Sequence, residues 1–121
     1  MKQKILIVDD VDTIARVYAR FLEKKGYNVD IAFNGKEALE TWEEFRPDLV
    51  ITDIRMPNMS GFELANKLRK KDPNQKIILM TGYANEAEVL AQQEDHGFPF
   101  FTKPADLETT VWELVKKILG E

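Results

Sequence analysis

Four short apolar runs recur along this chain, and each leads into polar residues of a distinct kind. The runs cover residues 5–8, 49–52, 77–80 and 98–101. The first leads into Asp9 and Asp10, the second into Asp53, the third into Thr81, and the fourth ends shortly before Lys103. Runs of this length, separated by longer segments of helical spacing, are typical of buried strands. We therefore expect these polar residues to follow strand ends.

The segments between the runs have the spacing of amphipathic helices. In the first of them, Asp12 or Thr13 is the expected N-cap and Gly26 the expected C-terminal stop. A weakly amphipathic helix is expected over residues 84–95, and we predict it to be the most mobile one. Asp106 is expected to cap the final helix. The inward face of the first helix is expected to carry Ile14, Val17, Tyr18, Phe21 and Leu22.

The order of these elements indicates an α/β fold. The first apolar run is the first expected strand, and the other four cover residues 27–33, 48–53, 76–81 and 98–102. Each strand is followed by a helix, so the chain contains five βα units. Near-continuous apolar strands alternating with amphipathic helices predict a parallel sheet covered on both faces and joined by right-handed crossovers. In such a doubly wound sheet, ligands bind at the carboxyl ends of the strands. The polar residues that follow the runs would meet there.

Composition limits the classes of function. The 121 residues suffice for one domain, and the absence of cysteine excludes disulfides and thiolate chemistry. The net charge is −4, from 17 basic and 21 acidic residues without a run of like charge, so direct nucleic-acid binding is not expected. The first apolar run is too short for a signal peptide or a membrane span, which predicts a cytoplasmic protein without a membrane partner.

Three carboxylates at one sheet edge repel one another unless a cation lies among them. Mg²⁺ suits such a shallow site, because it prefers oxygen ligands, keeps several waters and is held by one or two carboxylates together with phosphate oxygens. We expect Asp10 and Asp53 to be direct ligands and Asp9 to act through water.

The same edge holds groups suited to phosphoryl transfer. An aspartate carboxylate is a nucleophile toward phosphorus, and Asp53 is the candidate because it stands alone at the end of a central strand. An ammonium and a hydroxyl can stabilise charge on the equatorial phosphoryl oxygens. Lys103 and Thr81 supply these two groups.

With these residues in place, the chain resembles the receiver domains of two-component response regulators from Lys4 to Leu119. The resemblance rests on residues 5–10, 47–53, 56–57, 60–61, 80–82 and 102–104. It implies a flavodoxin-like (βα)5 sheet of strand order 2-1-3-4-5 with five helices. It also implies a signalling switch that takes a phosphoryl group from the phosphohistidine of a sensor histidine kinase or phosphotransfer protein onto Asp53. Such a protein is not a metabolic enzyme and catalyses only its own phosphorylation and dephosphorylation.

The resemblance also implies roles for individual residues. Thr81 and Lys103 correspond to the groups that sense the phosphoryl group, and Phe100 corresponds to the switch aromatic. Phosphorylation would draw Thr81 inward and let Phe100 fill the space that it leaves, changing the surface of the fourth helix, fifth strand and fifth helix. The implied metal site consists of Asp9, Asp10, Asp53 and the backbone carbonyl of Arg55.

Phe100 also has a simpler interpretation as core filling. Strand alternation places Phe100 and Phe101 on opposite faces of the sheet, so only one of them can face the main core. We expect Phe101 to be that residue. Because Phe100 lacks the hydroxyl of the commoner tyrosine, a switch at this position would work through packing alone.

Two other functions remain open. One is an aspartyl-phosphate hydrolase of the haloacid dehalogenase type, whose signature needs a second aspartate where this chain has Arg55. The other is a binding module that is never phosphorylated, which gives no reason for mutually repelling carboxylates. We expect residues 1–121 to form a single receiver domain without an output domain. It would act on a downstream effector protein, or on an output domain missing from this chain, and phosphorylation-dependent homodimerisation is left open.

Overall fold

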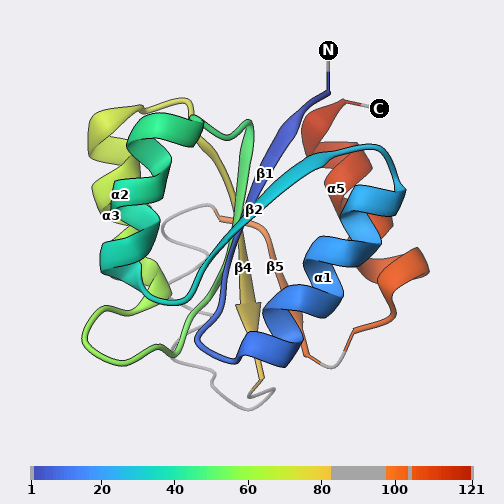
Figure 1. The fold of residues 1–121 in the computed structure, drawn as a ribbon, viewed down its shortest axis with the longest axis horizontal. Coiled ribbons are helices and arrows are strands. Elements are labelled where there is room, and N and C mark those ends of the chain that lie inside the picture. The colour runs from blue at the N-terminus through green and yellow to red at the C-terminus, as the bar shows by residue number, and fades with distance from the viewer. Residues whose placement is uncertain (1, 83–97, 104, 121) are drawn as a thin grey trace.

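The computed structural model describes residues 2–82, 98–103 and 105–120. Its centre is a five-stranded sheet in which every neighbouring pair of strands is parallel. The strand order is β2-β1-β3-β4-β5, which confirms the predicted order 2-1-3-4-5 (Figure 1). The strands are β1 (Lys4–Val8), β2 (Asn28–Ala32), β3 (Leu49–Asp53), β4 (Lys76–Thr81) and β5 (Phe100–Thr102).

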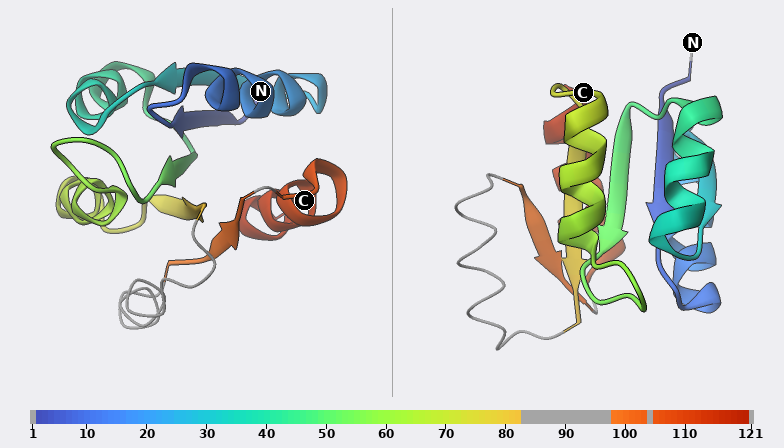
Figure 2. Two further views of the ribbon diagram at one scale, coloured as in Figure 1. Left: turned by 90° about the horizontal axis from the view of Figure 1, so that it is seen from below. Right: turned by 90° about the vertical axis from the view of Figure 1, so that its left-hand side faces the viewer.

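Helices cover both faces of this sheet (Figure 2). On one face lie α1 (Asp12–Lys24) and α5 (Trp112–Leu119), the latter preceded by a π-helical turn, η1 (Leu107–Val111). On the other face lie α2 (Gly35–Phe45) and α3 (Gly61–Lys71). The helix predicted over residues 84–95 lies outside the described residues.

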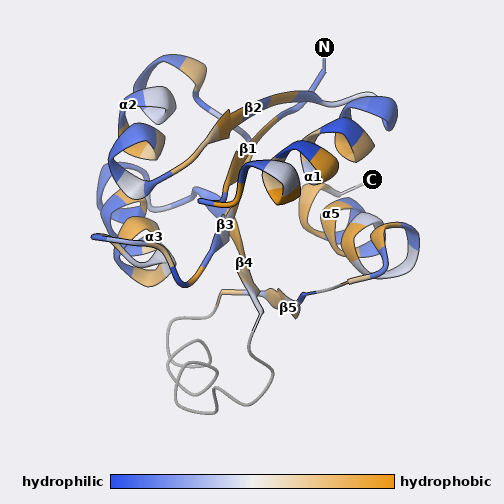
Figure 3. Ribbon diagram, turned by 60° about the horizontal axis from the view of Figure 1, so that its bottom comes forward, coloured by the Kyte–Doolittle hydropathy of each residue, from blue (hydrophilic) through white to orange (hydrophobic). Residues whose placement is uncertain are grey.

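Alternating strand residues feed two separate cores, one on each side of the sheet. Ile5 and Ile7 face α1 and α5, whereas Leu6 and Val8 face α2 and α3. Because successive strand side chains point to opposite faces, a strand that is apolar at every position must be covered on both sides. The central strands β1, β3 and β4 and the inner helix faces are accordingly mostly apolar, and the outer helix faces are mostly polar (Figure 3).

The inward face of α1 confirms most of the sequence prediction, because Ile14 and Phe21 pack against the same core as the buried residues of the helix, but Val17 does not. The buried residues are Ala15, Tyr18, Ala19 and Leu22, and Val17 is 54% exposed. These four buried positions have the i, i+3, i+4, i+7 spacing of one helix face. The sequence pattern placed Val17 on this face and passed over the two alanines, which are buried there instead.

The cap of α1 also differs from the prediction. The residue before the helix is Val11, and neither Asp12 nor Thr13 caps it. The Val11 amide instead donates to Asp9 Oδ1 at 3.0 Å, and the Asp12 carboxylate pairs with Arg16 one turn along the helix. A carboxylate of the sheet edge therefore orders the start of this helix.

Other helix ends follow the predicted chemistry. The Gly26 backbone after α1 has a φ of 102°, which suits the predicted glycine stop. Asp106 Oδ1 accepts from the Thr109 amide at 2.9 Å, which confirms the predicted cap of the final helix. Strand ends are less well predicted, since β2 and β5 are each shorter than expected by two residues, 28–32 against 27–33 and 100–102 against 98–102.

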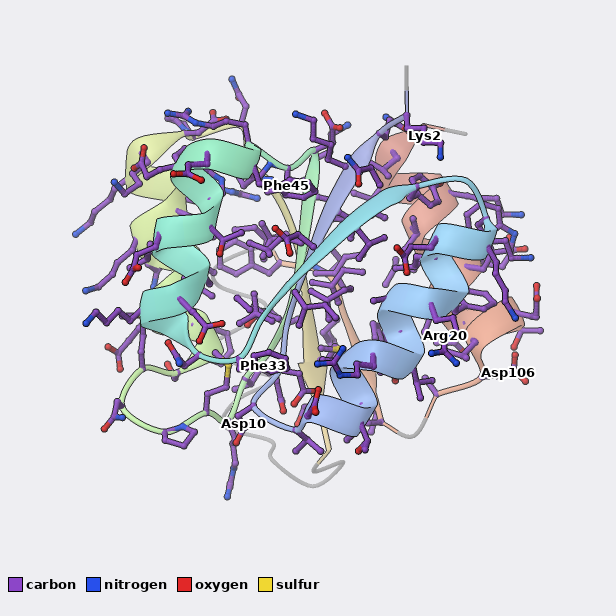
Figure 4. The ribbon with its side chains drawn as sticks, in the orientation of Figure 1. Lys2, Asp10, Arg20, Phe33, Phe45 and Asp106 are labelled. Atoms are coloured by element: carbon purple, nitrogen blue, oxygen red, sulfur yellow. The ribbon has the colours of Figure 1, made fainter. Side chains whose placement is uncertain are left out.

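The two ends of the described chain lie together at the amino ends of the strands (Figure 1). Lys2 lies at that end, whereas Asp10 lies at the opposite end, beyond the carboxyl end of β1 (Figure 4). Among the described residues, no helix combines the length and apolar character needed to cross a membrane.

Candidate functional site

Three of the predicted site residues are fixed by the sheet itself. Asp53 and Thr81 are the last residues of β3 and β4, and Asp9 directly follows β1. All three residues are buried, at 0% exposure for Asp9, 7% for Asp53 and 1% for Thr81. Lys103 follows β5, and its backbone amide donates to the Thr81 carbonyl at 2.6 Å. The parallel register thus delivers these four residues to one edge.

The predicted carboxylate cluster is present in the structure. One oxygen from each of Asp9, Asp10 and Asp53 lies within 4.8 Å of the other two. Asp9 and Asp53 are buried, whereas Asp10 is exposed at the rim. Such a set of oxygen donors, open to solvent on one side, fits a hard divalent cation that retains part of its water shell.

Lys103 binds two of these carboxylates at once. Its Nζ lies 3.0 Å from Asp9 Oδ2 and 3.0 Å from Asp53 Oδ2, and its side chain is 12% exposed. Since Asp9 Oδ1 accepts from the Val11 amide, both Asp9 oxygens have protein partners. This leaves Asp53 and the rim residue Asp10 with oxygens better placed than those of Asp9 to contact a cation directly.

The electrostatics of the pair reflect its burial. Burial raises the pKa of Asp53 above its ordinary value of 3.8; Lys103 opposes this, and the charges of Asp9 and Asp10 add to it. Burial alone would lower the pKa of Lys103, but Asp53 and Asp9 together raise it. Lys103 therefore remains an ammonium at neutral pH, and burial disfavours the charged form of Asp53.

A close backbone approach fixes the position of Asp53. The Gly61 amide, at the start of α3, donates to the Ile54 carbonyl at 2.8 Å. A Cβ at Gly61 would lie 2.2 Å from the Asp53 carbonyl oxygen, which is far inside contact distance. Ser60 Oγ caps α3 by accepting from the Glu63 amide at 3.1 Å. Ser60 and Gly61 belong to one of the sequence motifs, but nothing in that motif indicates this contact.

A cavity of about 800 Å³ opens beside the carboxylates, between α1 and the segment that follows β5. Its wall combines the polar edge of the sheet with apolar residues of α1. Tyr18, whose helical spacing predicts only a place on the apolar face of α1, belongs to this wall. The lining residues are Asp10, Val11, Thr13, Ile14, Val17, Tyr18, Asp53, Arg55, Gly82, Lys103, Ala105 and Leu107.

The remaining predicted residues lie around this edge. Arg55 is exposed and lines the cavity two positions after Asp53. Phe101 is buried in the core under α1 and α5, as expected, whereas Phe100 is 37% exposed. Phe100 is therefore not core filling in this structure, and the interpretation of it as a buried residue is wrong.

Comparison with known proteins agrees with this geometry. The family model of the response regulator receiver domain matches residues 5–115. Sporulation initiation phosphotransferase F of Bacillus subtilis is 35% identical over 119 residues, which cover 98% of this chain and 95% of the relative. The sensor kinase CckA of Brucella abortus is 39% identical over 118 residues, which cover 93% of this chain but only 12% of that kinase.

Solved structures give the same result. The response regulator TrrA from Thermotoga maritima, crystallised in complex with Mg²⁺-BeF, is 36% identical and superposes with a TM-score of 0.86. The match covers 96% of this chain and 98% of that one. The chain therefore belongs to the response regulator receiver domains, whose function is to accept a phosphoryl group in signalling.

Proposed function

We propose that Asp53 is the residue that accepts the phosphoryl group. The observation that carries this proposal is the Lys103 ammonium, held 3.0 Å from both Asp53 and Asp9 beside an open cavity. An Asp53 oxygen attacks phosphorus of a phosphohistidine, a new P–O bond forms, and the donor P–N bond breaks. The imidazole leaves with the electron pair of that bond and takes up a proton. Lys103 balances the charge on the phosphoryl oxygens, and the Thr81 hydroxyl contacts one of them.

Mg²⁺ fits the carboxylate cluster. Asp10, Asp53 and the Arg55 backbone carbonyl would contact it, with Asp9 acting through water. When bound, the ion neutralises charge that develops on the phosphoryl oxygens. Asp9 contributes separately, because its two oxygens hold the Val11 amide and the Lys103 ammonium in place.

The signal would pass to the surface formed by β5 and α5. Thr81 and Phe100 lie on adjacent strands, with Thr81 beside Thr102 in the β4–β5 register and Phe100 two residues earlier. Movement of Thr81 toward a phosphoryl group would free space into which the half-exposed Phe100 ring can turn. The protein would thereby change its affinity for a downstream effector protein, an output domain or a second copy of itself.

The partners follow from the same chemistry. The donor would be a sensor histidine kinase or a phosphotransfer protein in the cytoplasm. The Bacillus relative is named a phosphotransferase, which supports a role in passing the phosphoryl group onward. The single sheet with its covering helices supports one receiver domain over residues 1–121.

Intact mass spectrometry tests the proposal directly. The protein is incubated with Mg²⁺ and acetyl phosphate or phosphoramidate, alongside Asp53→Asn and the control Asp12→Asn. Asp12 is a neighbouring exposed carboxylate that pairs with Arg16 and lies outside the cluster. We expect one added phosphoryl group in the wild type and in Asp12→Asn, none in Asp53→Asn, and none after chelation. An adduct that persists in Asp53→Asn would refute the assignment of Asp53.

A further inference from the structure

Tyr18 is a buried tyrosine of α1 that lines the cavity. Its side chain is only 5% exposed, yet it lines the same cavity as Asp53 and Lys103. Its ring contacts Phe101, with centroids 5.9 Å apart and planes inclined by 51°. Phe101 precedes Lys103 by two residues on the same strand segment, so the chain that carries Lys103 also fixes the Tyr18 ring.

The Tyr18 hydroxyl forms no hydrogen bond with any residue that the structure describes. Buried hydroxyl groups in folded proteins nearly always have a partner, so an unpaired one beside a polar site calls for a specific explanation. Burial raises the pKa of Tyr18 above its ordinary value. The positive charge of Lys103 lowers this pKa, and the negative charges of Asp9 and Asp53 raise it further. The hydroxyl is therefore neutral at physiological pH and offers both a proton and free lone pairs.

The Lys103 ammonium has one N–H donor that no described residue accepts. An ammonium has three N–H donors, and two of them are used by Asp9 and Asp53. Within the described part of the chain, the third donor has no acceptor. A neutral hydroxyl is suited to this third position, because a further carboxylate would compete with an incoming phosphoryl group for the same charge.

We propose that Tyr18 is a positioning residue for phosphorylation, whose hydroxyl accepts the third N–H of Lys103 when the ammonium turns toward phosphoryl oxygens bound at Asp53. The inference rests on the proposed function of Asp53 and deepens it. Before phosphorylation, Lys103 is held by Asp9 and Asp53. Once the phosphoryl group occupies the Asp53 side of the cavity, the hydroxyl of Tyr18 keeps the ammonium on that side.

Two substitutions separate the hydroxyl from the ring. Tyr18→Phe removes only the oxygen and keeps the packing on Phe101, whereas Tyr18→Leu removes the ring as well. If the hydroxyl positions Lys103, both variants should be phosphorylated by phosphoramidate about ten-fold more slowly than the wild type, since each loses a hydrogen bond to a charged group. If Tyr18 only fills space, Tyr18→Phe should react at the wild-type rate and the proposal fails.

Tyr27→Phe is the matched control. Tyr27 is also 5% exposed and belongs to the same core cluster, but it does not line the cavity. We expect its phosphorylation rate to equal that of the wild type. A wild type that gains no phosphoryl group refutes the proposed function itself, whereas a reactive wild type with an equally reactive Tyr18→Phe overturns only the role of Tyr18.

Nuclear magnetic resonance of ¹³C-labelled lysine gives a readout that packing alone would not change. With Mg²⁺ and beryllofluoride as the phosphoryl mimic, we expect Tyr18→Phe to shift the Lys103 Cε resonance and Tyr27→Phe to leave it in place. The ring remains in both variants, so a shift confined to Tyr18→Phe reports the lost oxygen. Identical Lys103 resonances in all three proteins would contradict the proposal.

Discussion

Asp53 occupies a position that disfavours its own charge. It is nearly buried, and Asp9 and Asp10 lie beside it in the cluster. Lys103 relieves this repulsion only in part, because it is shared with Asp9. Perturbed carboxylates of this kind gather at functional sites, where stability is given up for chemistry.

Replacing Asp53 with asparagine should therefore stabilise the fold at neutral pH. The pKa of Asp53 is raised in the folded state, so folding favours the protonated form. The penalty is absent below the ordinary value of 3.8 and appears as pH rises through the folded-state pKa. We expect Asp53→Asn to gain about 1 kcal/mol at pH 7, or about 4 °C in Tm, and to lose this gain near pH 3.

Thermal unfolding followed by circular dichroism, in chelator and at several pH values, measures this effect. Asp12→Asn serves as the control, because Asp12 is exposed and paired with Arg16. Its Tm should show no such pH-dependent gain. A Tm of Asp53→Asn below that of the wild type at pH 7 would show that the Lys103 pair outweighs the repulsion.

Some site residues could be predicted from the sequence and others could not. Asp9, Asp53 and Thr81 stand at the ends of apolar runs, and strand ends meet at one edge whatever the details of packing. Tyr18 lies mid-helix among apolar residues, where spacing indicates only a buried face. The direction of its hydroxyl depends on how α1 packs against Phe101, which no local pattern encodes.

At the scale of elements, the contact between α3 and β3 determines where the Asp53 backbone lies. The first residue of α3 is Gly61, whose amide donates to the Ile54 carbonyl just after β3. The absence of a side chain lets the helix start directly against the strand end. The loop between them is therefore held at both ends, by this contact and by the Ser60 cap.

Gly61→Ala should disturb both stability and phosphorylation. The new Cβ would lie 2.2 Å from the Asp53 carbonyl oxygen and 2.9 Å from Ile54 Cα, and backbone atoms cannot move aside as a flexible side chain can. We expect a loss of about 2 kcal/mol or more in urea unfolding. We also expect slower phosphorylation by acetyl phosphate, because α3 must shift away from Asp53.

Gly82→Ala provides the comparison for stability, since a Cβ there would meet no heavy atom of the described residues within 4 Å. Its free energy of unfolding should stay within about 0.5 kcal/mol of the wild type. Equal losses in the free energy of unfolding for the two substitutions would mean that the close approach at Gly61 is not the cause of the destabilisation.

Elements were predictable where their periodicity is strong. Continuous apolar runs gave β1, β3 and β4, and helical spacing gave α1, α2 and α3. Their ends were less certain, because caps depend on partners from other elements. The start of α1 is the clearest case, since the Val11 amide is satisfied by Asp9 rather than by Asp12 or Thr13.

At the scale of the whole molecule, Mg²⁺ should couple the site to global stability. The carboxylate cluster exists only when strands distant in sequence are paired, so the unfolded chain binds the ion weakly. At ten times its Kd, Mg²⁺ should add about 1.4 kcal/mol to the free energy of unfolding, which raises Tm by about 5 °C. Thermal melting across MgCl₂ concentrations at constant ionic strength measures this.

Variants define which carboxylates carry the Mg²⁺ effect. Asp10→Asn should need a higher Mg²⁺ concentration for the same rise in Tm, because Asp10 is the exposed carboxylate of the cluster. Asp12→Asn should respond as the wild type does. An unchanged response in Asp10→Asn would exclude Asp10 as a ligand.

Fold class followed from the alternation of elements, but strand order did not. Right-handed crossovers allow several orders for five parallel strands. No local sequence pattern in β2 indicates that it pairs with the edge of β1 that faces away from β3. The order 2-1-3-4-5 came from the family resemblance. The observed register then explains why Asp9 and Asp53, from neighbouring strands, share one lysine.

Lys2 and the end of α5 lie at the end of the sheet opposite Asp10 (Figures 1 and 4). A surface tether, a fluorophore or a fused reporter joined at either position would therefore leave the cavity open to a bulky phosphoryl donor. Immobilised protein could then be charged, washed and offered to candidate kinases or effectors in sequence. The same geometry makes the chain suitable as the sensing unit of an optical reporter of phosphoryl transfer.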